Sequence, residues 1–466
     1  MIKVGILSFS DGRGRVHKAL ETYINECRDH LKCYLEKTGE VTVCFPEIII
    51  NSTKQAKIQG MEMASQKPDA VILNIPVFAF PNFTVIALNM LSIPCLAISP
   101  VNGKMPGLGG LQAAVGMIRQ LGFKCEKVWG NIEEPETINK VMIFLHAAYA
   151  VTSLNGQVYG LLGGRSIGMG TGTVNPDVWM RLFGVDVQHI DQLEIIRRAE
   201  HMEGERVEKA FTWLNEKMQS VQYDGDKLTE DSLKFQIRCY YATKELVDEY
   251  GLDFIGVKCH FDLSEYYVTQ CISAAFFNDP YDWDGEKEPV VFSCEADSDG
   301  ALTMQIMKLV SGRPVLFFDF RHYDIKDNVF SFCNCGAMST WYAQRSQDAE
   351  ENLGSVKLLP IISKYGGKGC HVQYVAKAGE MTFGRLTRVQ DKYRFTAFLG
   401  NFKRLPDEKL EETCPVWPHG YVETSVVPDT LISRYSSNHI HGIYGNYIDE
   451  LKMFCEIKGI DYEVIV

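Results

Sequence analysis

Short apolar runs alternate with longer amphipathic segments over the first 150 residues, and this alternation restricts the fold more than any other feature of the chain. Strand-like runs lie at residues 2–9, 41–49, 69–77 and 94–100, and a helical pattern covers residues 16–37. Strands that alternate with helices are typical of βαβ units, whose strands lie parallel in one sheet. We therefore expect an α/β domain with helices on both faces of a parallel sheet.

The same alternation resumes near Gly156 and gives way to a different pattern after about residue 320. Beyond that point, short β-like runs are separated by turn residues, as in a small antiparallel barrel. The predicted fold is α/β, with two doubly wound parallel-sheet (Rossmann-like) domains followed by a C-terminal antiparallel β-barrel domain. The predicted boundaries are 1–155, 156–318 and 319–466, and the last domain includes a returning terminal segment. A chain of 466 residues is also too long for a single core.

Charge and cysteine usage limit the classes of partner. Acidic residues outnumber basic ones by 59 to 47, which disfavours a nucleic-acid partner. Residues 70–103 contain no charged side chain, but four prolines interrupt them, so we expect buried parallel strands and no membrane span. The N-terminus lacks the pattern of a signal peptide, and the fourteen cysteines are therefore expected to be reduced thiols in the cytoplasm. Cys333 and Cys335 lack the second pair that a zinc finger requires.

Two carboxylates end neighbouring apolar runs. Glu295 follows the run that begins at Pro289, Asp319 ends the run that begins at Arg313, and a helical pattern separates the two runs. A strand–helix–strand crossover usually places its strands in one parallel sheet, about 4.8 Å apart if they are neighbours. Two acids so close repel each other unless a proton or a cation lies between them. The pair indicates either a divalent metal site with oxygen ligands or two ordinary polar strand ends.

Two other features carry competing interpretations. His439 and His441 lie in one loop-like segment, and a histidine beside the carboxylates would complete a nitrogen and oxygen site that suits manganese. Sequence spacing alone does not bring residue 439 beside residue 319.

The glycine-rich run at 163–174 has Gly168, Gly170 and Gly172 after a strand, and Asp191 ends the next strand. This matches a dinucleotide fingerprint only in part, and the alternative is a tight turn that needs positive φ.

At these residues the chain resembles the L-fucose isomerase and L-arabinose isomerase family, and more closely its fucose isomerase branch. The resemblance covers most of the chain and is most specific over residues 276–323, with further similarity at 10–20, 161–174 and 437–460. It implies an aldose–ketose isomerase that works through a cis-enediol, with Mn²⁺ or another divalent cation held by Glu295, Asp319 and His439. It also implies that Glu295 and Asp319 share the acid–base catalysis and that the protein is a homo-oligomer, expected as a hexamer, with sites between subunits.

The resemblance also implies which residues bind the sugar. The candidate substrate-binding residues are Arg13, Arg165, Lys258, Trp417 and Asn438. Arg165 and Lys258 depart from the family, since they stand where the fucose isomerases have uncharged side chains. The substrate is therefore expected to be either a fucose- or arabinose-like sugar or an anionic hexose such as sulfoquinovose, and the alternative is that either charge only pairs with a neighbouring acid. No dinucleotide cofactor is expected. The alternatives are a non-catalytic sugar-binding protein on the same fold and an NAD-dependent oxidoreductase that uses the Gly168 loop.

Overall fold

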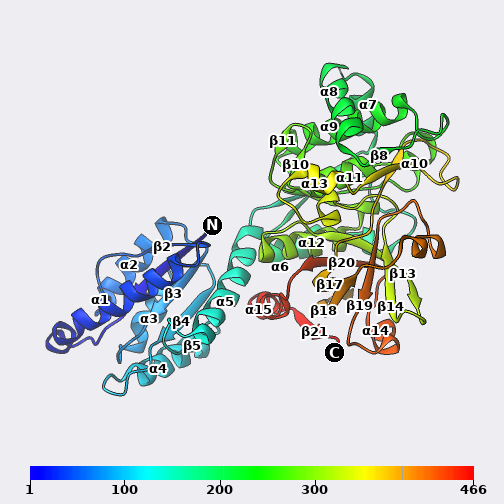
Figure 1. Cartoon of the computed structure of the whole chain (residues 1–466). Coiled ribbons are helices and arrows are strands. Elements are labelled where there is room, and N and C mark those ends of the chain that lie inside the picture. The colour runs from blue at the N-terminus through cyan, green and yellow to red at the C-terminus, as the bar shows by residue number, and fades with distance from the viewer. Residues whose placement is uncertain (203, 391) are drawn as a thin grey trace. The chain divides into compact units, whose positions relative to one another are not determined.

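The computed structural model describes residues 1–202, 204–390 and 392–466, which form two compact units. One unit contains Met1–Asn155 together with Asp449–Gly459, and the other contains Gly156–Ile448 together with Ile460–Val466. Figure 1 follows the chain through both units by colour. Within the described ranges, no helix combines the length and the apolar character that crossing a membrane requires.

The first unit is built on a five-stranded parallel sheet in the order β2-β1-β3-β4-β5. Its strands are β1 (Ile2–Ser8), β2 (Val41–Cys44), β3 (Ala70–Asn74), β4 (Cys95–Ser99) and β5 (Glu126–Trp129). Its helices are α1 (Gly14–Glu36), α2 (Thr53–Ser65), α3 (Pro81–Leu88), α4 (Gly107–Gln120), α5 (Pro135–Leu154) and, from the far end of the chain, α15 (Ile448–Lys458). The α/β class with a parallel sheet in the N-terminal region is thus confirmed.

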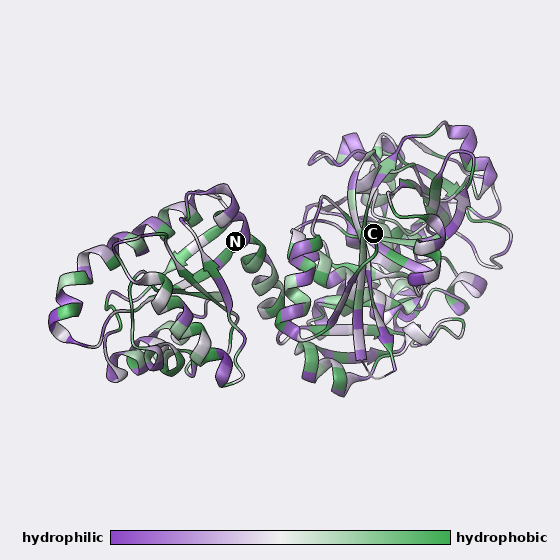
Figure 2. Cartoon of the chain, turned by 90° about the horizontal axis from the view of Figure 1, so that it is seen from below, coloured by the Kyte–Doolittle hydropathy of each residue, from purple (hydrophilic) through white to green (hydrophobic). Residues whose placement is uncertain are grey.

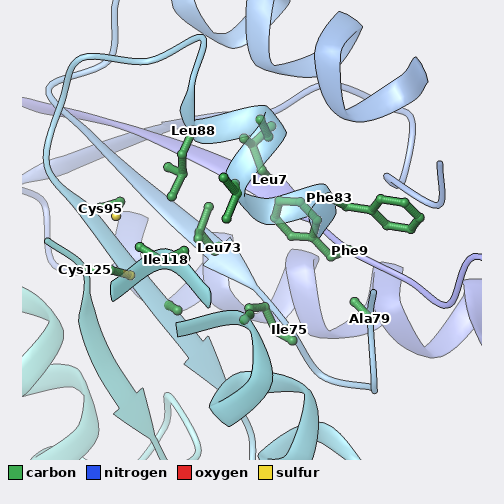
Figure 3. Close-up of a cluster of buried hydrophobic side chains, with 14 of the residues drawn as sticks. Leu7, Phe9, Leu73, Ile75, Ala79, Phe83, Leu88, Cys95, Ile118 and Cys125 are labelled. Atoms are coloured by element: carbon green, nitrogen blue, oxygen red, sulfur yellow. The ribbon is translucent and has the colours of Figure 1, made fainter. Parts of the chain in front are cut away.

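Apolar side chains fill both faces of this sheet. Successive residues of β3 belong to two different core clusters, with Ile72 in one and Leu73 in the other, because neighbouring side chains of a strand point to opposite faces. Figure 3 shows the cluster around Leu73 and Phe83. The uncharged segment 70–103 accordingly supplies two fully buried parallel strands, β3 and β4, as expected. The helices carry both hydrophilic and hydrophobic segments along their length (Figure 2), as expected where one helix face meets the sheet.

Helix α15 completes the cluster that contains Ile72. Met453 and Ile457 pack against the cluster that contains Ile72. The ammonium group of Lys124 donates hydrogen bonds of 2.6 and 3.1 Å to the carbonyl oxygens of Glu456 and Ile457 in the last turn of the helix. A cation at this end also interacts favourably with the helix dipole.

The second unit contains a four-stranded parallel sheet in the order β12-β9-β6-β7. The strands are β6 (Val158–Leu162), β7 (Asp186–Ile190), β9 (Phe254–Val257) and β12 (Val291–Ser293). The helices of this region are α6 (Pro176–Phe183), α7 (Leu193–Glu200), α8 (Gly204–Lys217), α9 (Glu230–Tyr250), α10 (Asp262–Tyr266), α11 (Cys271–Asn278) and α12 (Ser298–Ser311). The 3₁₀ turns η1 (Gly170–Gly172) and η2 (Cys294–Ala296) follow β6 and β12.

A seven-stranded mixed sheet follows, in the order β17-β20-β13-β14-β19-β18-β21, with a further pairing between β17 and β18. Its strands are β13 (Leu316–Asp324), β14 (Val329–Cys333), β17 (Gly379–Val389), β18 (Lys392–Lys403), β19 (His419–Glu423), β20 (His439–Tyr444) and β21 (Asp461–Val464). The sheet is mixed because β21 pairs with β18 in parallel, whereas the other pairings are antiparallel. The description as an antiparallel barrel and the three-domain boundaries stay predictions.

Smaller elements complete the unit. A three-stranded sheet contains β8 (Ser220–Val221), β15 (Lys357–Pro360) and β16 (Cys370–Gln373), and a hairpin contains β10 (Tyr281–Asp282) and β11 (Gly285–Glu286). The remaining helical elements are η3 (Thr340–Ala343), α13 (Ala349–Leu353), η4 (Asp407–Glu412) and α14 (Pro428–Arg434).

Two histidines buried in this unit predict a loss of stability in acid. Burial lowers the pKa of His371 to about 3 and that of His419 to about 4, so both are neutral in the folded chain. The unfolded chain binds these protons below pH 6.5, so their contribution to stability is complete above that pH and is lost as the pH falls. Each histidine is expected to cost about 2 kcal/mol at pH 5.

Urea unfolding at pH 7 and pH 5, with a chelator present throughout, measures this loss. The control is the double variant His371→Gln/His419→Gln, which lacks both titrating groups. We expect the free energy of unfolding to fall by about 4 kcal/mol less in the variant than in the wild type between the two pH values. An equal fall in the two proteins would contradict the assignment.

Candidate metal and active site

Glu295 lies in a strained turn at the end of β12. Inside η2 it has φ 58° and ψ 19°, and Ala296 after it has φ 51°. A left-handed conformation costs a residue other than glycine about 1–3 kcal/mol and is found most often at functional sites. The next residue, Asp297, caps α12 by accepting a hydrogen bond of 3.0 Å from the amide of Gly300. The turn therefore fixes Glu295 between a strand end and a helix start.

Asp319 and His439 lie directly opposite each other on neighbouring antiparallel strands. The register of β13 and β20 pairs residue 319 with residue 439. Side chains so paired project to the same face of a sheet. His439 Nε2 lies 3.5 Å from Asp319 Oδ1 and 3.4 Å from Glu295 Oε2, so the two carboxylates and the imidazole converge on one point.

The expected route to this convergence was wrong. Glu295 follows β12 in the four-stranded parallel sheet, whereas Asp319 lies on β13 in the mixed sheet, so the two strands are not members of one parallel sheet. Helix α12 connects one sheet to the other, and contacts both β12 and β20. Ser298 and Asp299 at the same helix start are also residue types that cap helices, but the side chain of Asp297 is the one that caps α12.

A buried network holds the ring of His439. Its Nδ1 donates a hydrogen bond of 2.7 Å to Asp297 Oδ2, and its Nε2 faces Glu295 and Asp319. Asp297 is fully buried and also accepts hydrogen bonds of 2.8 and 2.9 Å from the guanidinium of Arg385, which is fully buried too. Arg385 in turn donates to Nε2 of His441 at 2.9 Å. A carboxylate behind a histidine, as Asp297 is here, is the usual partner that orients a metal-binding imidazole.

Electrostatics follow from this crowding. Burial lowers the pKa of His439, but hydrogen bonds to Asp297 and Glu295 outweigh it and raise the pKa to about 10. Desolvation raises the pKa of Asp319 to about 7. Desolvation also opposes the charge on Asp297, but Arg385 and His439 hold its pKa well below the usual range. The ionised forms of these buried carboxylates are therefore stabilised by the positive charge of neighbouring groups.

Glu295 faces a second set of donors. Its Oε1 lies 3.6 Å from Nε2 of His260, in the loop after β9. One ligand atom each from His260, Glu295 and Cys335 lie within 4.8 Å of one another, a spacing at which the three could hold a metal ion. Glu295 therefore lies between a nitrogen and oxygen set and a set that includes sulfur.

The predicted sugar-binding residues lie in different surroundings. Asn438 Nδ2 donates a hydrogen bond of 3.4 Å to Asp319 Oδ1. Trp417 is buried, with the cations of Lys364 and Arg321 at 5.1 and 5.7 Å from its ring. Arg13 belongs to the first unit, where its exposed guanidinium pairs with Asp11 at 2.7 Å.

The two predicted cations end strands of the same parallel sheet as Glu295. Lys258 follows β9 and pairs with Asp262 at 2.7 Å. Arg165 follows β6 and donates hydrogen bonds to the carbonyl oxygens of Met169 and Gly168. Gly168 has φ 79°, and Gly170 and Gly172 form η1. The carboxyl ends of parallel strands meet at one edge, which is where open α/β sheets bind ligands.

Sequence reasoning missed Asp297, Arg385 and His260, and it considered Cys335 only with Cys333 as an incomplete zinc-finger pair. Asp297 stands two residues after Glu295, and its position before an apolar helical run is a signal for a helix cap. Arg385 lies in a strand in which seven consecutive residues are buried, but no pattern in a single sequence pairs it with a residue 88 positions away. His260 and Cys335 come from loops that no periodicity connects.

Known proteins resemble this chain along its length. Residues 1–156 and 157–241 match the models of the first and second N-terminal domains of L-fucose isomerase, and residues 332–465 match the model of its C-terminal domain. Sulfoquinovose isomerase of Alkalicoccus urumqiensis is 24% identical over 359 residues, which cover 74% of this chain and 75% of that protein. L-fucose isomerase of Haemophilus influenzae is 24% identical over 454 residues, with 81% and 76% covered.

Proposed function

Because this chain belongs to the L-fucose isomerase family and is therefore an aldose–ketose isomerase, we propose that it acts with a divalent cation, Mn²⁺ by preference, held by Glu295, Asp319 and His439. The observation that supports the proposal is the convergence of these side chains from three separate segments, with His439 Nε2 at 3.4 and 3.5 Å from the two carboxylates. Their separations exceed those of charge-assisted hydrogen bonds, about 2.7–2.9 Å, and leave room for an ion.

The donor set fits the cation. Two carboxylates and one imidazole provide oxygen and nitrogen ligands, which suit manganese. Asp297 accepts a hydrogen bond from Nδ1–H of His439, so Nε2 is the ring nitrogen that would bind the cation. The cation also offsets the repulsion between the two carboxylates of Glu295 and Asp319.

The proposed reaction moves hydrogen between C1 and C2 of an open-chain sugar. The cation, when bound, stabilises the negative charge that develops on the two sugar oxygens. Glu295 and Asp319 divide the proton transfer between them, with one taking the proton from C2 and one returning a proton to C1. Asp297 and Arg385 keep His439 oriented throughout, and Asn438 holds one oxygen of Asp319 by the hydrogen bond of 3.4 Å.

The substrate is proposed to be an aldose of the fucose or arabinose kind or an anionic hexose such as sulfoquinovose. Lys258 and Arg165, at the same sheet edge as Glu295, supply the positive charge that an anionic sugar group would need. Arg13, Trp417 and Asn438 are proposed to complete the pocket. A homo-oligomer, as a hexamer with sites between subunits, is part of the same proposal and places the Arg13 loop in a neighbour's site.

Chelation and a panel of sugars test the proposal together. The protein is stripped with a chelator, divided, and incubated with neutral and anionic aldoses with and without Mn²⁺, and ketose formation is followed by NMR. We expect turnover of one class of aldose with Mn²⁺, at least about tenfold slower turnover without it, and full recovery on adding the ion back. Undiminished turnover after exhaustive chelation would contradict the role of the cation.

A further inference from the structure

A second group of metal donors shares Glu295 with the site just described. Glu295 Oε2 faces His439 at 3.4 Å, whereas Oε1 faces His260 Nε2 at 3.6 Å. The ligand atoms of His260, Glu295 and Cys335 all lie within 4.8 Å of one another. The three residues come from the loop after β9, from η2 and from the segment after β14, so the fold itself assembles the group.

The ring of His260 is held in the orientation that a metal ligand needs. Its Nδ1 lies 3.0 Å from Oγ of Ser264, and the ring stacks on Tyr365 with centroids 5.0 Å apart. The hydroxyl of Tyr365 lies 3.2 Å from Nε2, the position of a donor to a lone pair. A hydrogen bond behind a ring nitrogen is the arrangement that orients metal-binding histidines, and here it directs Nε2 toward Glu295.

The chemistry of this group differs from that of the first site. It offers sulfur, nitrogen and oxygen, whereas Glu295, Asp319 and His439 offer nitrogen and oxygen only. Thiolate ligands favour zinc over manganese, and zinc sites with three protein ligands keep a fourth position open. Adjacent donors on a tetrahedral zinc ion lie about 3.3–3.8 Å apart. The 3.6 Å between His260 and Glu295 meets that spacing, and Cys294 places a second sulfur 3.9 Å from that of Cys335.

We propose that His260, Glu295 and Cys335 form a zinc site whose occupation inhibits the isomerase. On binding, the thiol of Cys335 releases its proton to solvent, and its sulfur donates an electron pair to Zn²⁺, as do Nε2 of His260 and Oε1 of Glu295. Tyr365 gives up its hydrogen bond to Nε2. When Oε1 of Glu295 is bound to zinc, its electron pair is no longer available to accept a proton from the sugar. The inhibition rests on the proposed function, but the zinc site does not.

Spectroscopy with Co²⁺ as the probe tests the site without any activity. Cobalt bound to a thiolate gives a charge-transfer band in the near ultraviolet that cobalt bound to nitrogen and oxygen lacks. Co²⁺ is added to protein from which other metal has been removed. We expect the charge-transfer band in the wild type and in Asp319→Asn, and we expect its loss in Cys335→Ser. The matched control is Cys370→Ser, which keeps the band, because Cys370 hydrogen-bonds to Gln236 Oε1 at 3.2 Å and a serine hydroxyl makes the same bond.

A second variant tests the site independently, in case Cys335→Ser misfolds. His260→Gln keeps the thiol and should weaken cobalt binding by about 10–100-fold or more, with circular dichroism unchanged. A band that persists at full strength in Cys335→Ser, or that is absent from the wild type, would overturn the site.

Zinc titration of the Mn²⁺-saturated enzyme tests the inhibition. The Zn²⁺ concentration for half-inhibition is expected to rise at least about tenfold in Cys335→Ser and to stay unchanged in Cys370→Ser. Equal sensitivity of the wild type and Cys335→Ser would overturn the inhibitory role. If the chain isomerises no sugar, the cobalt band still decides whether the zinc site exists, so failure of the proposed function and failure of this site give different results.

Discussion

Replacing Glu295 with glutamine is expected to reduce turnover by about 10³-fold or more while the chain keeps its fold. Glutamine has nearly the same shape, but its amide accepts no proton at neutral pH, and general acid–base catalysis contributes about 10²–10⁴-fold. The amide is also a weaker metal ligand than a carboxylate, which adds to the loss. Turnover of the best aldose from the panel, with Mn²⁺ in excess, measures the effect.

The matched control is Glu265→Gln, which makes the same substitution on a carboxylate outside the donor set. Glu265 accepts a hydrogen bond of 3.1 Å from the amide of Gly366, which a glutamine oxygen also accepts. We expect this variant to keep wild-type turnover. Titration with Mn²⁺ separates the two losses in Glu295→Gln, because a missing base persists at saturating metal and a weakened ligand does not. Turnover near the wild-type value in Glu295→Gln would remove Glu295 from the mechanism.

Replacing Arg385 with methionine is expected to destabilise the chain by about 3–5 kcal/mol. The guanidinium and the carboxylate of Asp297 are both fully buried and 2.8 Å apart, so the substitution leaves a charge in the interior without its main partner. The free energy of unfolding in urea, measured on metal-free protein, gives the loss. The control is Arg394→Met on the neighbouring strand β18, whose partner Glu463 lies 3.4 Å away and is partly exposed to solvent. A partly exposed pair of this kind contributes about 1 kcal/mol or less.

A double variant separates stability from metal binding. In Arg385→Met/Asp297→Asn, no charge remains of the buried pair, so most of the stability is expected to return. The amide introduced at position 297 is a weaker acceptor for Nδ1 of His439 than a carboxylate, and Mn²⁺ affinity should stay about 10–100-fold below the wild type. A double variant as unstable as Arg385→Met would show that the methionine fits poorly and that the buried charge is not the cause.

The sequence predicts single strands and helices better than it predicts which segments, far apart in the chain, pack together. The apolar runs before Glu295 and up to Asp319 are visible as strands, because periodicity is a local property. The predicted end of the second strand was wrong, since Asp319 lies inside β13 and the more polar residues His322, Tyr323 and Asp324 continue the pairing with β14. The membership of the two strands in different sheets is not visible, because a crossover helix fixes neither the partner nor the sheet of the strand that follows it.

The position of His439 shows a second limit. The register of β13 with β20 sets it opposite Asp319, and register between strands 120 residues apart depends on tertiary packing, which spacing does not encode. Family resemblance suggested the histidine where the residues alone left it open. Arg385 and Asp297 show a third limit. An arginine and an aspartate that form a buried ion pair cannot be distinguished in the sequence from the same residues at the surface, because only the fold determines their burial.

Helix α15 has a consequence for the order in which the protein matures. Translation proceeds from the N-terminus, so Met1–Asn155 leaves the ribosome while Asp449–Gly459 is still unmade. At about 5–20 residues per second, that interval lasts roughly 15–60 s. Throughout it, the apolar surface that later receives Met453 and Ile457 faces water on the nascent chain. The unit whose synthesis begins first is therefore completed only near the end of translation, and during this interval a chaperone would have most apolar surface to cover.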